Sequence, residues 1–312
     1  MPKVSDPAHP SWSHREESCA RRLVHMALSE DLLGDLESEL PPHQCHAADV
    51  TTHQLISEAQ SGCAALVARS QGVVAGLPIA RLVLDHLGWA GIYHWNVRDG
   101  DRVEAGDKLA HFRGQAAVLL TAERTLLNFV QRLSGIATLT ARFIGAIQGM
   151  PVLICDTRKT TPGWRALEKY AVRCGGGHNH RSGLFDGILV KDNHLAVLDG
   201  AEDFTGIVGR LRRQVPNVPI QIEVDSLDQV RLALRAQPDA LLLDNMPAEL
   251  LRQAVSLRNQ IAPQVVLEAS GGITLDTIRE VAASGVDRIS IGALTHSAPA
   301  LDIALDWLGH DR

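Results

Sequence analysis

A complete strand–helix–strand unit lies between residues 220 and 244: Ile220-Gln-Ile-Glu-Val-Asp-Ser-Leu-Asp-Gln-Val-Arg-Leu-Ala-Leu-Arg-Ala-Gln-Pro-Asp-Ala-Leu-Leu-Leu-Asp244. Its ends, 220–224 and 240–243, are short apolar runs of the kind found in buried strands. The stretch 227–236 between them carries apolar residues at helical spacing. This order predicts two parallel strands joined by a right-handed crossover.

The same alternation continues on both sides of this unit, from residue 151 onward. Strands are expected at 152–155, 187–190, 220–224, 240–243, 265–267 and 288–291. Helices are expected between them at 163–173, 202–214, 227–236, 248–259 and 274–283. Such alternation indicates a parallel sheet, and continuous apolar strands indicate burial on both of its faces.

Polar or charged residues follow almost every expected strand. In a β/α barrel these strand ends surround one mouth, whereas an open doubly wound sheet gathers only those near its switch point. No Gly-x-Gly-x-x-Gly follows a strand, which argues against a dinucleotide-binding fold. We therefore expect a barrel, and six visible strands are consistent with an incomplete or open one.

The N-terminal half has a mixed pattern. It predicts helices at 20–33 and 79–87, short strands at 64–68 and 72–75, and one or two helices over 123–148. Asp-Gly and Ala-Gly pairs within 96–110 predict a hairpin. The polar segment 1–18 is expected to be disordered, and a last helix is expected at about 298–308.

Composition excludes several classes of protein. The chain has 312 residues, 45% hydrophobic, and a formal net charge of -6, which argues against nucleic-acid binding. No apolar run is long enough to span a bilayer, and the N-terminus lacks the apolar core of a signal peptide. Five irregularly spaced cysteines predict reduced thiols in the cytoplasm rather than a disulfide framework.

Positive residues gather at two places, after one expected strand and after one run of glycines. Arg158 and Lys159 follow the first barrel strand, and His180 and Arg181 follow three glycines. Arginine matches planar carboxylates in bidentate fashion, and lysine acts as a point charge. The placement favours a receptor for a polyanionic small molecule over the alternative, a solvated basic face.

Three further charged residues end neighbouring strands. Lys191 follows Gly-Ile-Leu-Val, where a lysine could form a Schiff base, hold a phosphate or pair with an acid such as Glu223. Glu223 and Asp244 each close a strand, and two carboxylates at one mouth suggest a Mg²⁺ site. The alternative is that Glu223 neutralises nearby cations.

Two glycine-containing loops follow the last two strands. Ser270-Gly271-Gly272-Ile273 precedes a helix, and Gly292-Ala-Leu-Thr-His296 follows the final strand. Exposed amides at such places bind phosphate in β/α barrels. The alternative is a pair of tight turns.

Three other features are interpreted as structural. His43, Cys45 and His46 lack a second half at ligand spacing and are interpreted as a flexible loop. Cys174 beside glycines is interpreted as a packing residue, and the Asp99–Asp107 stretch as a structural hairpin.

Taken together, these motifs resemble the quinolinate phosphoribosyltransferase family. The resemblance covers nearly the whole chain from about Arg21, and its motifs are Asp156-Thr-Arg-Lys-Thr-Thr-Pro-Gly, Lys169-Tyr-Ala-Val-Arg-Cys-Gly-Gly-Gly, Asn179-His-Arg, Lys191-Asp-Asn-His, Glu223-Val-Asp, Leu243-Asp-Asn, Glu268-Ala-Ser-Gly-Gly-Ile and Gly292-Ala-Leu-Thr-His-Ser-Ala. It implies transfer of phosphoribosyl from phosphoribosyl pyrophosphate to quinolinate with decarboxylation, giving nicotinate mononucleotide, pyrophosphate and CO2 in de novo NAD biosynthesis.

The resemblance also implies an architecture, that of a type II phosphoribosyltransferase. An N-terminal α/β sandwich (19–147 and 296–312) accompanies an open seven-stranded β/α barrel (148–295). The family forms homodimers or higher assemblies in which the N-terminal domain of one subunit caps the barrel of another. Glu123-Arg-Thr-Leu-Leu-Asn resembles the stretch that donates an arginine across the interface, which gives Arg124 that role.

Site roles follow from the same resemblance. Quinolinate would be bound by Arg124, Arg158, Lys159, His180 and Arg181. Lys159, Lys191, Glu223 and Asp244 would be catalytic, with Glu223 and Asp244 holding Mg²⁺ directly or through water. The phosphoribosyl group and its phosphate would be bound by Lys191, Glu223, Asp244, Ser270, Gly271, Gly272, Gly292 and His296. No organic cofactor, nucleic acid or membrane is implied.

The chain departs from the family's pattern at one place, and rival functions remain. A Pro- and His-containing insertion around Glu37–Ala47 separates Glu30-Asp-Leu from Asp49-Val-Thr-Thr. The rivals are a paralogue of the same fold, molybdenum-transport-associated or nicotinate-specific, a Schiff-base aldolase using Lys191, and a phosphate-sensing module without catalytic activity.

Overall fold

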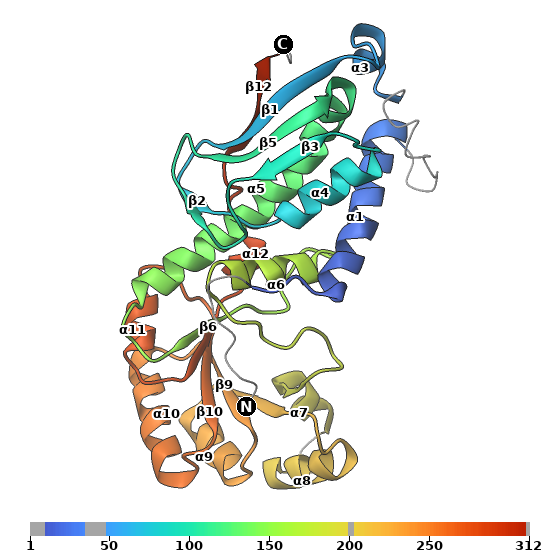
Figure 1. The fold of residues 1–312 in the computed structure, drawn as a ribbon. Coiled ribbons are helices and arrows are strands. Elements are labelled where there is room, and N and C mark those ends of the chain that lie inside the picture. Colours follow the sequence, from blue (N-terminus) through green and yellow to red (C-terminus); the bar gives the residue numbers. More distant parts are fainter. Residues whose placement is uncertain (1–9, 35–47, 199–202, 310–312) are drawn as a thin grey trace. The chain divides into compact units, whose positions relative to one another are not determined.

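A computed structural model describes residues 10–34, 48–198 and 203–309 (Figure 1). These residues form two compact units. Unit 1 comprises Met1–Ala141, Thr161–Gly176 and Ser297–Arg312, and unit 2 comprises Arg142–Thr160 and Gly177–His296. The insertion around Glu37–Ala47, with the cluster of His43, Cys45 and His46, lies outside the described residues.

The units differ from the expected domains at two places. Thr161–Gly176 groups with unit 1, whereas the sequence placed it in the barrel domain. The long helix α5 (Ala116–Ala146) contributes its last residues to unit 2. A contiguous interpretation of the strand–helix alternation could not detect that one crossover segment belongs to the other unit.

Unit 1 is built on a four-stranded antiparallel sheet in the order β12-β1-β5-β3. Its strands are β1 (Ser61–Ala68), β3 (Ile92–Trp95), β5 (Lys108–Gln115) and β12 (Ile303–Gly309). The expected hairpin within 96–110 is corrected: β5 pairs with β3 and β1, while β4 (Arg102–Val103) turns away to pair with β2 (Gly72–Val73).

The expected C-terminal helix at 298–308 is wrong. Residues 303–309 form β12, which pairs antiparallel with β1 from Ala68↔Ile303 to Cys63↔Gly309. The apolar residues of this segment fit both helical spacing and alternation, and such short runs are ambiguous in sequence. Pairing with an otherwise open edge of the sheet decides the outcome, because it satisfies a row of main-chain hydrogen-bonding groups.

The helices of unit 1 include one that begins earlier than expected. α1 (His14–Leu33) starts at a capping box in which Ser13 and Glu16 satisfy each other's main-chain donors. Residues 14–18, expected to be disordered, are therefore helical. The other helices are α3 (Val50–Leu55), α4 (Leu77–His86), the single uninterrupted α5, and α6 (Arg165–Cys174).

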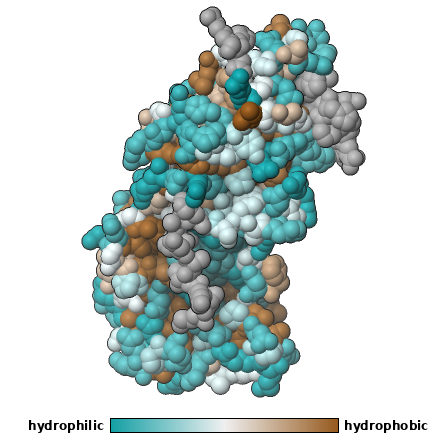
Figure 2. Space-filling view, in the orientation of Figure 1, coloured by the Kyte–Doolittle hydropathy of each residue, from teal (hydrophilic) through white to brown (hydrophobic). Residues whose placement is uncertain are grey.

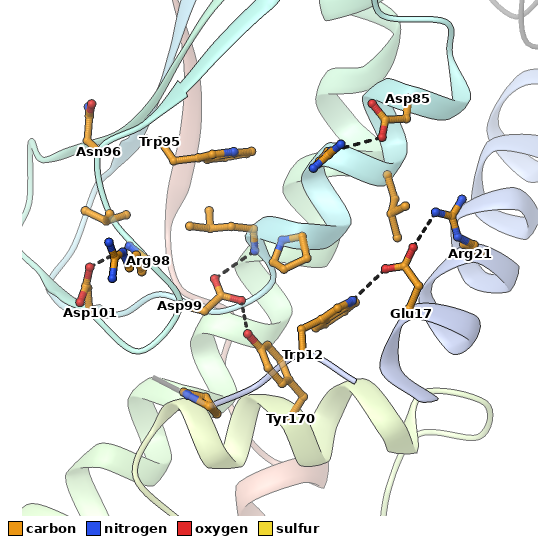
Figure 3. A pocket seen from close by; sticks show the side chains of 16 residues that line it. Trp12, Glu17, Arg21, Asp85, Trp95, Asn96, Arg98, Asp99, Asp101 and Tyr170 are labelled. Carbon is orange, nitrogen blue, oxygen red and sulfur yellow. Dashed lines mark hydrogen bonds and ion pairs between the residues drawn. The ribbon is translucent and has the colours of Figure 1, made fainter. Parts of the chain in front are cut away.

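Asp99 has a structural role, in agreement with the interpretation of the Asp99–Asp107 stretch. Its carboxylate accepts the main-chain N–H groups of Gly76 (2.9 Å) and Leu77 (3.1 Å), so it caps α4, which has no capping side chain of its own. It also accepts the Tyr170 hydroxyl at 2.8 Å. Leu77, Asp99 and Tyr170 line a cavity of about 880 Å³ within unit 1 (Figure 3).

The stability of unit 1 is expected to depend on pH through Asp99. Burial raises the pKa of Asp99 to about 6 from 3.8, against three hydrogen bonds that lower it. The folded state therefore binds this proton more tightly than the unfolded chain, so the contribution of Asp99 to stability falls as the pH rises from about 4 to about 6. We expect a loss of about 1–3 kcal/mol across this window.

Urea unfolding of the wild type and of Asp99→Asn between pH 4 and 8 measures this effect. The variant should be less stable, because its amide NH2 faces main-chain donors, and it should lack the wild-type decline between pH 4 and 6. Parallel pH profiles for the two proteins would exclude Asp99 as the titrating group.

Unit 2 is a parallel sheet in the order β6-β11-β10-β9-β8-β7. All six strands coincide with expected ones to within a few residues: β6 (Leu153–Cys155), β7 (Ile188–Val190), β8 (Ile220–Val224), β9 (Ala240–Asp244), β10 (Val266–Ser270) and β11 (Arg288–Ser290). Beyond β6, His178 forms a single parallel bridge with Cys155. Within the residues that the structure describes, no pairing between β6 and β7 closes the sheet, in line with an open barrel in which a seventh strand is reduced to one bridge.

The helices of unit 2 are α7 (Asp192–Leu198), α8 (Phe204–Gln214), α9 (Leu227–Arg235), α10 (Ala248–Ile261), α11 (Ile278–Ala282) and α12 (Ala293–His296). Four of them, α8 to α11, occupy predicted intervals, whereas α7 and α12 were not predicted. In Figure 1, α8 to α10 lie along the outside of the strands. The fold class, an α/β sandwich domain with an open β/α barrel, is confirmed.

The visible surface is largely hydrophilic, with apolar residues in separate patches (Figure 2). Among the described residues, no helix combines the length and apolar character needed to cross a lipid bilayer.

Candidate active site

A pocket of about 790 Å³ opens at the carboxyl ends of the barrel strands in unit 2. In β/α barrels this end of the sheet carries the functional side chains. The pocket is lined by twelve of the thirteen residues singled out from the sequence: Arg158, Lys159, His180, Arg181, Lys191, Glu223, Asp244, Ser270, Gly271, Gly272, Gly292 and His296. Arg124 is exposed on α5 in unit 1 and is not among the lining residues.

Strand register explains how distant residues meet. Asp244, Ser270, Ser290 and Cys155 pair in turn across β9, β10, β11 and β6. Glu223 lies one layer deeper, because it pairs with Leu242, which in turn pairs with Glu268. Parallel strands in this register place their last side chains around one opening.

Arg158, Lys159 and Arg181 form what we call the cationic cluster. Among the described residues, no carboxylate forms an ion pair with any of the three. Burial and the neighbouring Arg158 charge lower the pKa of Arg181. The Arg158 Nε atom is buried without a hydrogen-bond partner. Like charges held together and an unused buried donor are costly, so this arrangement suits a bound anion.

The main chain that carries Arg181 is held firmly. The fully buried Asp156 accepts the His180 main-chain N–H at 2.8 Å and the Asn179 side-chain amide at 2.6 Å. The Arg181 guanidinium donates to the Gly187 carbonyl at 2.9 Å. The guanidinium therefore has a defined position before any ligand arrives, which lowers the entropic cost of binding.

Lys191 and Glu223, which also line the pocket, form an ion pair. Lys191 Nζ is 3.1 Å from Glu223 Oε2, with the lysine side chain 43% exposed. The ion pair between Lys191 and Glu223 that the alternative interpretation expected is thus present. The pair leaves the lysine accessible to a phosphate ligand, because the ammonium group has further donors.

Asp244 is oriented by a residue that the sequence patterns did not single out. Asn245 donates from Nδ2 to Asp244 Oδ2 at 2.8 Å and has a φ of 53°, a left-handed conformation that is uncommon outside glycine. The sequence Leu243-Asp-Asn is compatible with a left-handed residue at 245, since asparagine tolerates this conformation better than most residues.

The two glycine-containing loops contact these side chains closely. A Cβ on Gly271, whose φ is +99°, would lie 2.1 Å from Asn245 Oδ1, and a Cβ on Gly292 would lie 3.0 Å from both Lys159 Cδ and His296 Nε2. Thr295 Oγ1 donates to the Lys159 carbonyl at 2.7 Å, which ties the Gly292 loop to the cationic cluster. A side chain at Gly271 would therefore displace Asn245, and one at Gly292 would press on Lys159 and His296.

The pocket could hold Mg²⁺ only with help from a ligand or water. The described residues contain no group of three or more His, Cys, Asp or Glu side chains arranged to hold a metal. Glu223 and Asp244 supply hard oxygen ligands, and Mg²⁺ is commonly bound by one or two carboxylates plus waters and substrate phosphates. The residues present fit this mode.

Cys174 is unsuited to nucleophilic catalysis. It is buried in unit 1, and desolvation raises the pKa of its thiol well above the usual value. None of Cys19, Cys63, Cys155 and Cys174 forms a disulfide.

Comparison with known protein families agrees with these features. The profile described as the C-terminal domain of quinolinate phosphoribosyl transferase matches residues 136–306. The profile described as the N-terminal domain of the same protein matches residues 49–134. Together the two profiles account for most of the chain.

Individual relatives are similar over nearly their whole length. The chain is 42% identical over 293 residues to the carboxylating nicotinate-nucleotide pyrophosphorylase of Mycobacterium leprae, covering 93% of this chain and 98% of that one. It is 36% identical over 319 residues to a decarboxylating quinolinate phosphoribosyltransferase of Nicotiana glauca, covering 97% and 84%. The solved nicotinate-nucleotide pyrophosphorylase of Francisella tularensis superimposes with a TM-score of 0.83 at 34% identity, covering 97% and 99%.

Proposed function

Because the chain belongs to the quinolinate phosphoribosyltransferase family, we propose that its barrel pocket is the site of that family's reaction. The protein is an enzyme that transfers phosphoribosyl from phosphoribosyl pyrophosphate to quinolinate with decarboxylation, a step of de novo NAD biosynthesis. Each part of this reaction can be assigned to residues of the pocket.

The cationic cluster is the observation that carries the assignment. Quinolinate bears two adjacent carboxylates on a flat ring, and the guanidinium of Arg158 lies close enough to that of Arg181 to lower the pKa of Arg181. Both lie in one pocket with Lys159, and within the described part of the chain neither is recorded in an ion pair with a carboxylate. In our proposal the three side chains bind the two carboxylates, and His180 lies in the same wall.

The remaining part of the pocket binds phosphoribosyl pyrophosphate. Lys191, Glu223 and Asp244 position the ribose and the pyrophosphate, while Ser270, Gly271, Gly272, Gly292 and His296 surround the 5'-phosphate. Glycine main-chain amides can approach a phosphate without steric hindrance, which is the usual arrangement after late barrel strands. Glu223 and Asp244 would hold Mg²⁺, which supplies positive charge to the leaving pyrophosphate.

The chemistry follows from this placement. The pyridine nitrogen attacks the ribose carbon on the face opposite the pyrophosphate, and the bond from that carbon to the pyrophosphate oxygen breaks. Lys191 stabilises the charge that develops on the leaving group. Binding of both carboxylates orients the nitrogen toward the ribose carbon. The binding energy thus offsets much of the entropic part of the barrier. When the adjacent carboxylate leaves as CO2, its bonding electron pair stays on the ring carbon, where the positive charge of the quaternary nitrogen stabilises it, and a proton from water then completes nicotinate mononucleotide.

Two rival functions lose support. Lys191 Nζ is held in an ion pair with Glu223, so a Schiff-base mechanism would first have to break that contact. A transferase specific for nicotinate, a monocarboxylate, has no need of a cationic cluster of three residues.

A turnover assay tests the proposal. The purified protein, supplied with phosphoribosyl pyrophosphate and Mg²⁺, should release CO2 from carboxyl-labelled quinolinate and should turn over nicotinate at least about a hundredfold less efficiently. Equal use of the two acids, or binding of phosphoribosyl pyrophosphate without CO2 release, would refute it.

A homodimer with shared sites is also proposed, because the resemblance gives Arg124 a role across the subunit interface and its side chain is exposed on α5. We expect Arg124→Ala and Arg158→Ala to be inactive alone but to regain activity when mixed. In a mixed dimer one site has an intact barrel and receives the intact Arg124 of the other subunit. Refolding the two variants together and assaying turnover tests this, and no recovery despite proven subunit exchange contradicts it.

A matched pair of glycine substitutions tests the phosphate end. Gly271→Ala is expected to lower kcat/KM for phosphoribosyl pyrophosphate by about 10- to 100-fold, because the new Cβ displaces Asn245 and with it Asp244. Gly106→Ala carries the same backbone strain, at φ +96°, in open space in unit 1. It should unfold at lower urea yet keep wild-type kinetics. Equal kinetic losses in both would show a general effect of strain.

We also propose that the enzyme works in the cytoplasm. The absence of disulfides among the described cysteines supports a reducing compartment.

A further inference from the structure

His180 lies in the pocket wall, but both of its ring nitrogens are used by the protein. Nδ1 accepts the main-chain N–H of Arg181 at 2.8 Å. Nε2 lies 3.0 Å from Gln221 Oε1. A histidine in this state has no ring N–H left for a substrate carboxylate, although it sits beside the cationic cluster.

Behind His180 the contacts continue into the barrel interior. Gln221 Nε2 donates to Glu268 Oε2 at 3.1 Å. Glu268 is fully buried, and Gln221 is buried as well. The second Glu268 oxygen, Oε1, has no hydrogen-bond partner and lies 3.4 Å from His180 Nε2. Neither Gln221 nor Glu268 lines the pocket.

The chain of hydrogen bonds can run in only one direction. A carboxylate only accepts, so the Gln221 amide must turn its NH2 toward Glu268 and its oxygen toward His180. Nε2 must then carry the proton, which leaves Nδ1 with its lone pair. At the other end the Arg181 main-chain N–H can only donate, and it meets that lone pair. The two ends are independent and require the same tautomer.

This inference rests on the proposed function. We propose that Glu268 and Gln221 are positioning residues that lock His180 as the Nε2-protonated tautomer. His180 then fixes the Arg181 main chain within the cationic cluster and donates no hydrogen bond to quinolinate itself. Arg181 is thereby held at both ends, by His180 at its main chain and by the Gly187 carbonyl at its guanidinium. Such an arrangement orients a binding group much as outer partners orient metal-binding histidines.

Steady-state kinetics of Glu268→Gln and Gln221→Leu test the proposal. Glutamine at 268 can donate as well as accept, so one of the two constraints on the His180 tautomer is lost and only the Arg181 main-chain N–H remains. We expect KM for quinolinate to rise by about 5- to 50-fold in each variant while KM for phosphoribosyl pyrophosphate stays unchanged. Glu249→Gln, an exposed glutamate on α10 of the same unit, is the matched control and should behave as wild type.

A double variant shows whether Glu268 acts through His180. In a His180→Ala background, Glu268→Gln should cause no further rise in KM for quinolinate, because the link it controls has gone. Additive losses, an unchanged KM in Glu268→Gln, or equal rises in both KM values would each overturn the proposal.

A direct measurement guards against variants that fail to fold. The ¹⁵N chemical shifts of the His180 ring in the wild-type protein, assigned by comparison with His180→Ala, should show a neutral imidazole protonated at Nε2 alone. Protonation at Nδ1 would overturn the proposal whatever the kinetics. This readout does not depend on turnover, so it separates failure of the tautomer lock from failure of the proposed function, which the quinolinate assay of the wild type decides.

Discussion

Replacing Arg158 by alanine should lower kcat/KM for quinolinate by about 10²- to 10³-fold. The substitution removes one member of a charge-assisted pair with a carboxylate, and such losses cost about 3–5 kcal/mol when the partner stays buried. KM for phosphoribosyl pyrophosphate should change little, because its proposed ligands lie on other strands. Steady-state kinetics with each substrate varied in turn measure both quantities.

The stability of Arg158→Ala should not fall along with its activity. Arg158 has a buried Nε without a hydrogen-bond partner. Its charge also lowers the pKa of the neighbouring Arg181, which means that it disfavours the charged form of that side chain. Removal of Arg158 should therefore leave the urea midpoint unchanged or slightly raised. Arg158→Lys should be intermediate in kinetics, since it keeps the charge and loses the fork. Arg252→Ala, an exposed arginine on α10, is the matched control. A loss of folding in Arg158→Ala equal to its loss of activity would contradict a role in binding.

Replacing Asp244 by asparagine should lower kcat by about 10²- to 10³-fold at saturating substrates. The change keeps the shape and the contact with Asn245 but removes a charged oxygen from the proposed Mg²⁺ site. Electrostatic stabilisation of a leaving group is commonly worth this much. The Mg²⁺ concentration for half-maximal rate should also rise, and a magnesium titration of the initial rate measures it.

Two comparisons make this result specific. Asp228→Asn, an exposed aspartate paired with Arg231 on α9, should keep wild-type kinetics. In Asp244→Asn, KM for quinolinate should stay within about threefold of wild type, since the cationic cluster is intact. An unchanged magnesium requirement together with a large loss in kcat would show that Asp244 acts on the ribose rather than on a metal.

Much of unit 2 could be predicted from sequence because its signals are local. Each barrel strand is a short apolar run, and Glu223, Asp244 and Ser270 mark the ends of their strands. In a parallel sheet these ends lie at one edge, so residues at successive strand ends are neighbours in space. This is why twelve of the thirteen selected residues line one pocket.

Some secondary structure was predicted wrongly, mainly where contacts with distant parts of the chain determine it. The 303–309 segment is a strand because β1 offers an edge, which nothing within the segment reveals. Residues 14–18 are helical because Ser13 and Glu16 cap the helix, although the polar composition of the segment favours disorder. The direction of side chains inside the barrel was also missed. Alternation in Ile-Gln-Ile-Glu-Val marked Gln221 as an interior polar residue beside Glu223.

The role of His180 needed coordinates of neighbouring atoms. Its position after three glycines placed it in the site, and the resemblance implied substrate binding. Only the contacts of its two ring nitrogens, with Arg181 and Gln221, show that it is already engaged. Hydrogen-bond direction depends on three side chains from separate strands and loops, and no spacing in one segment encodes it.

Equilibrium binding of quinolinate to the wild-type protein, measured by titration calorimetry, examines the cationic cluster most directly. Quinolinate should bind at least about a hundredfold more tightly than nicotinate, since one carboxylate paired with an arginine is worth about 3 kcal/mol or more. That preference should disappear in Arg158→Ala. Equal affinities for the two acids in the wild type, or a preference that survives in the variant, would show that the pocket does not recognise a dicarboxylate through these residues.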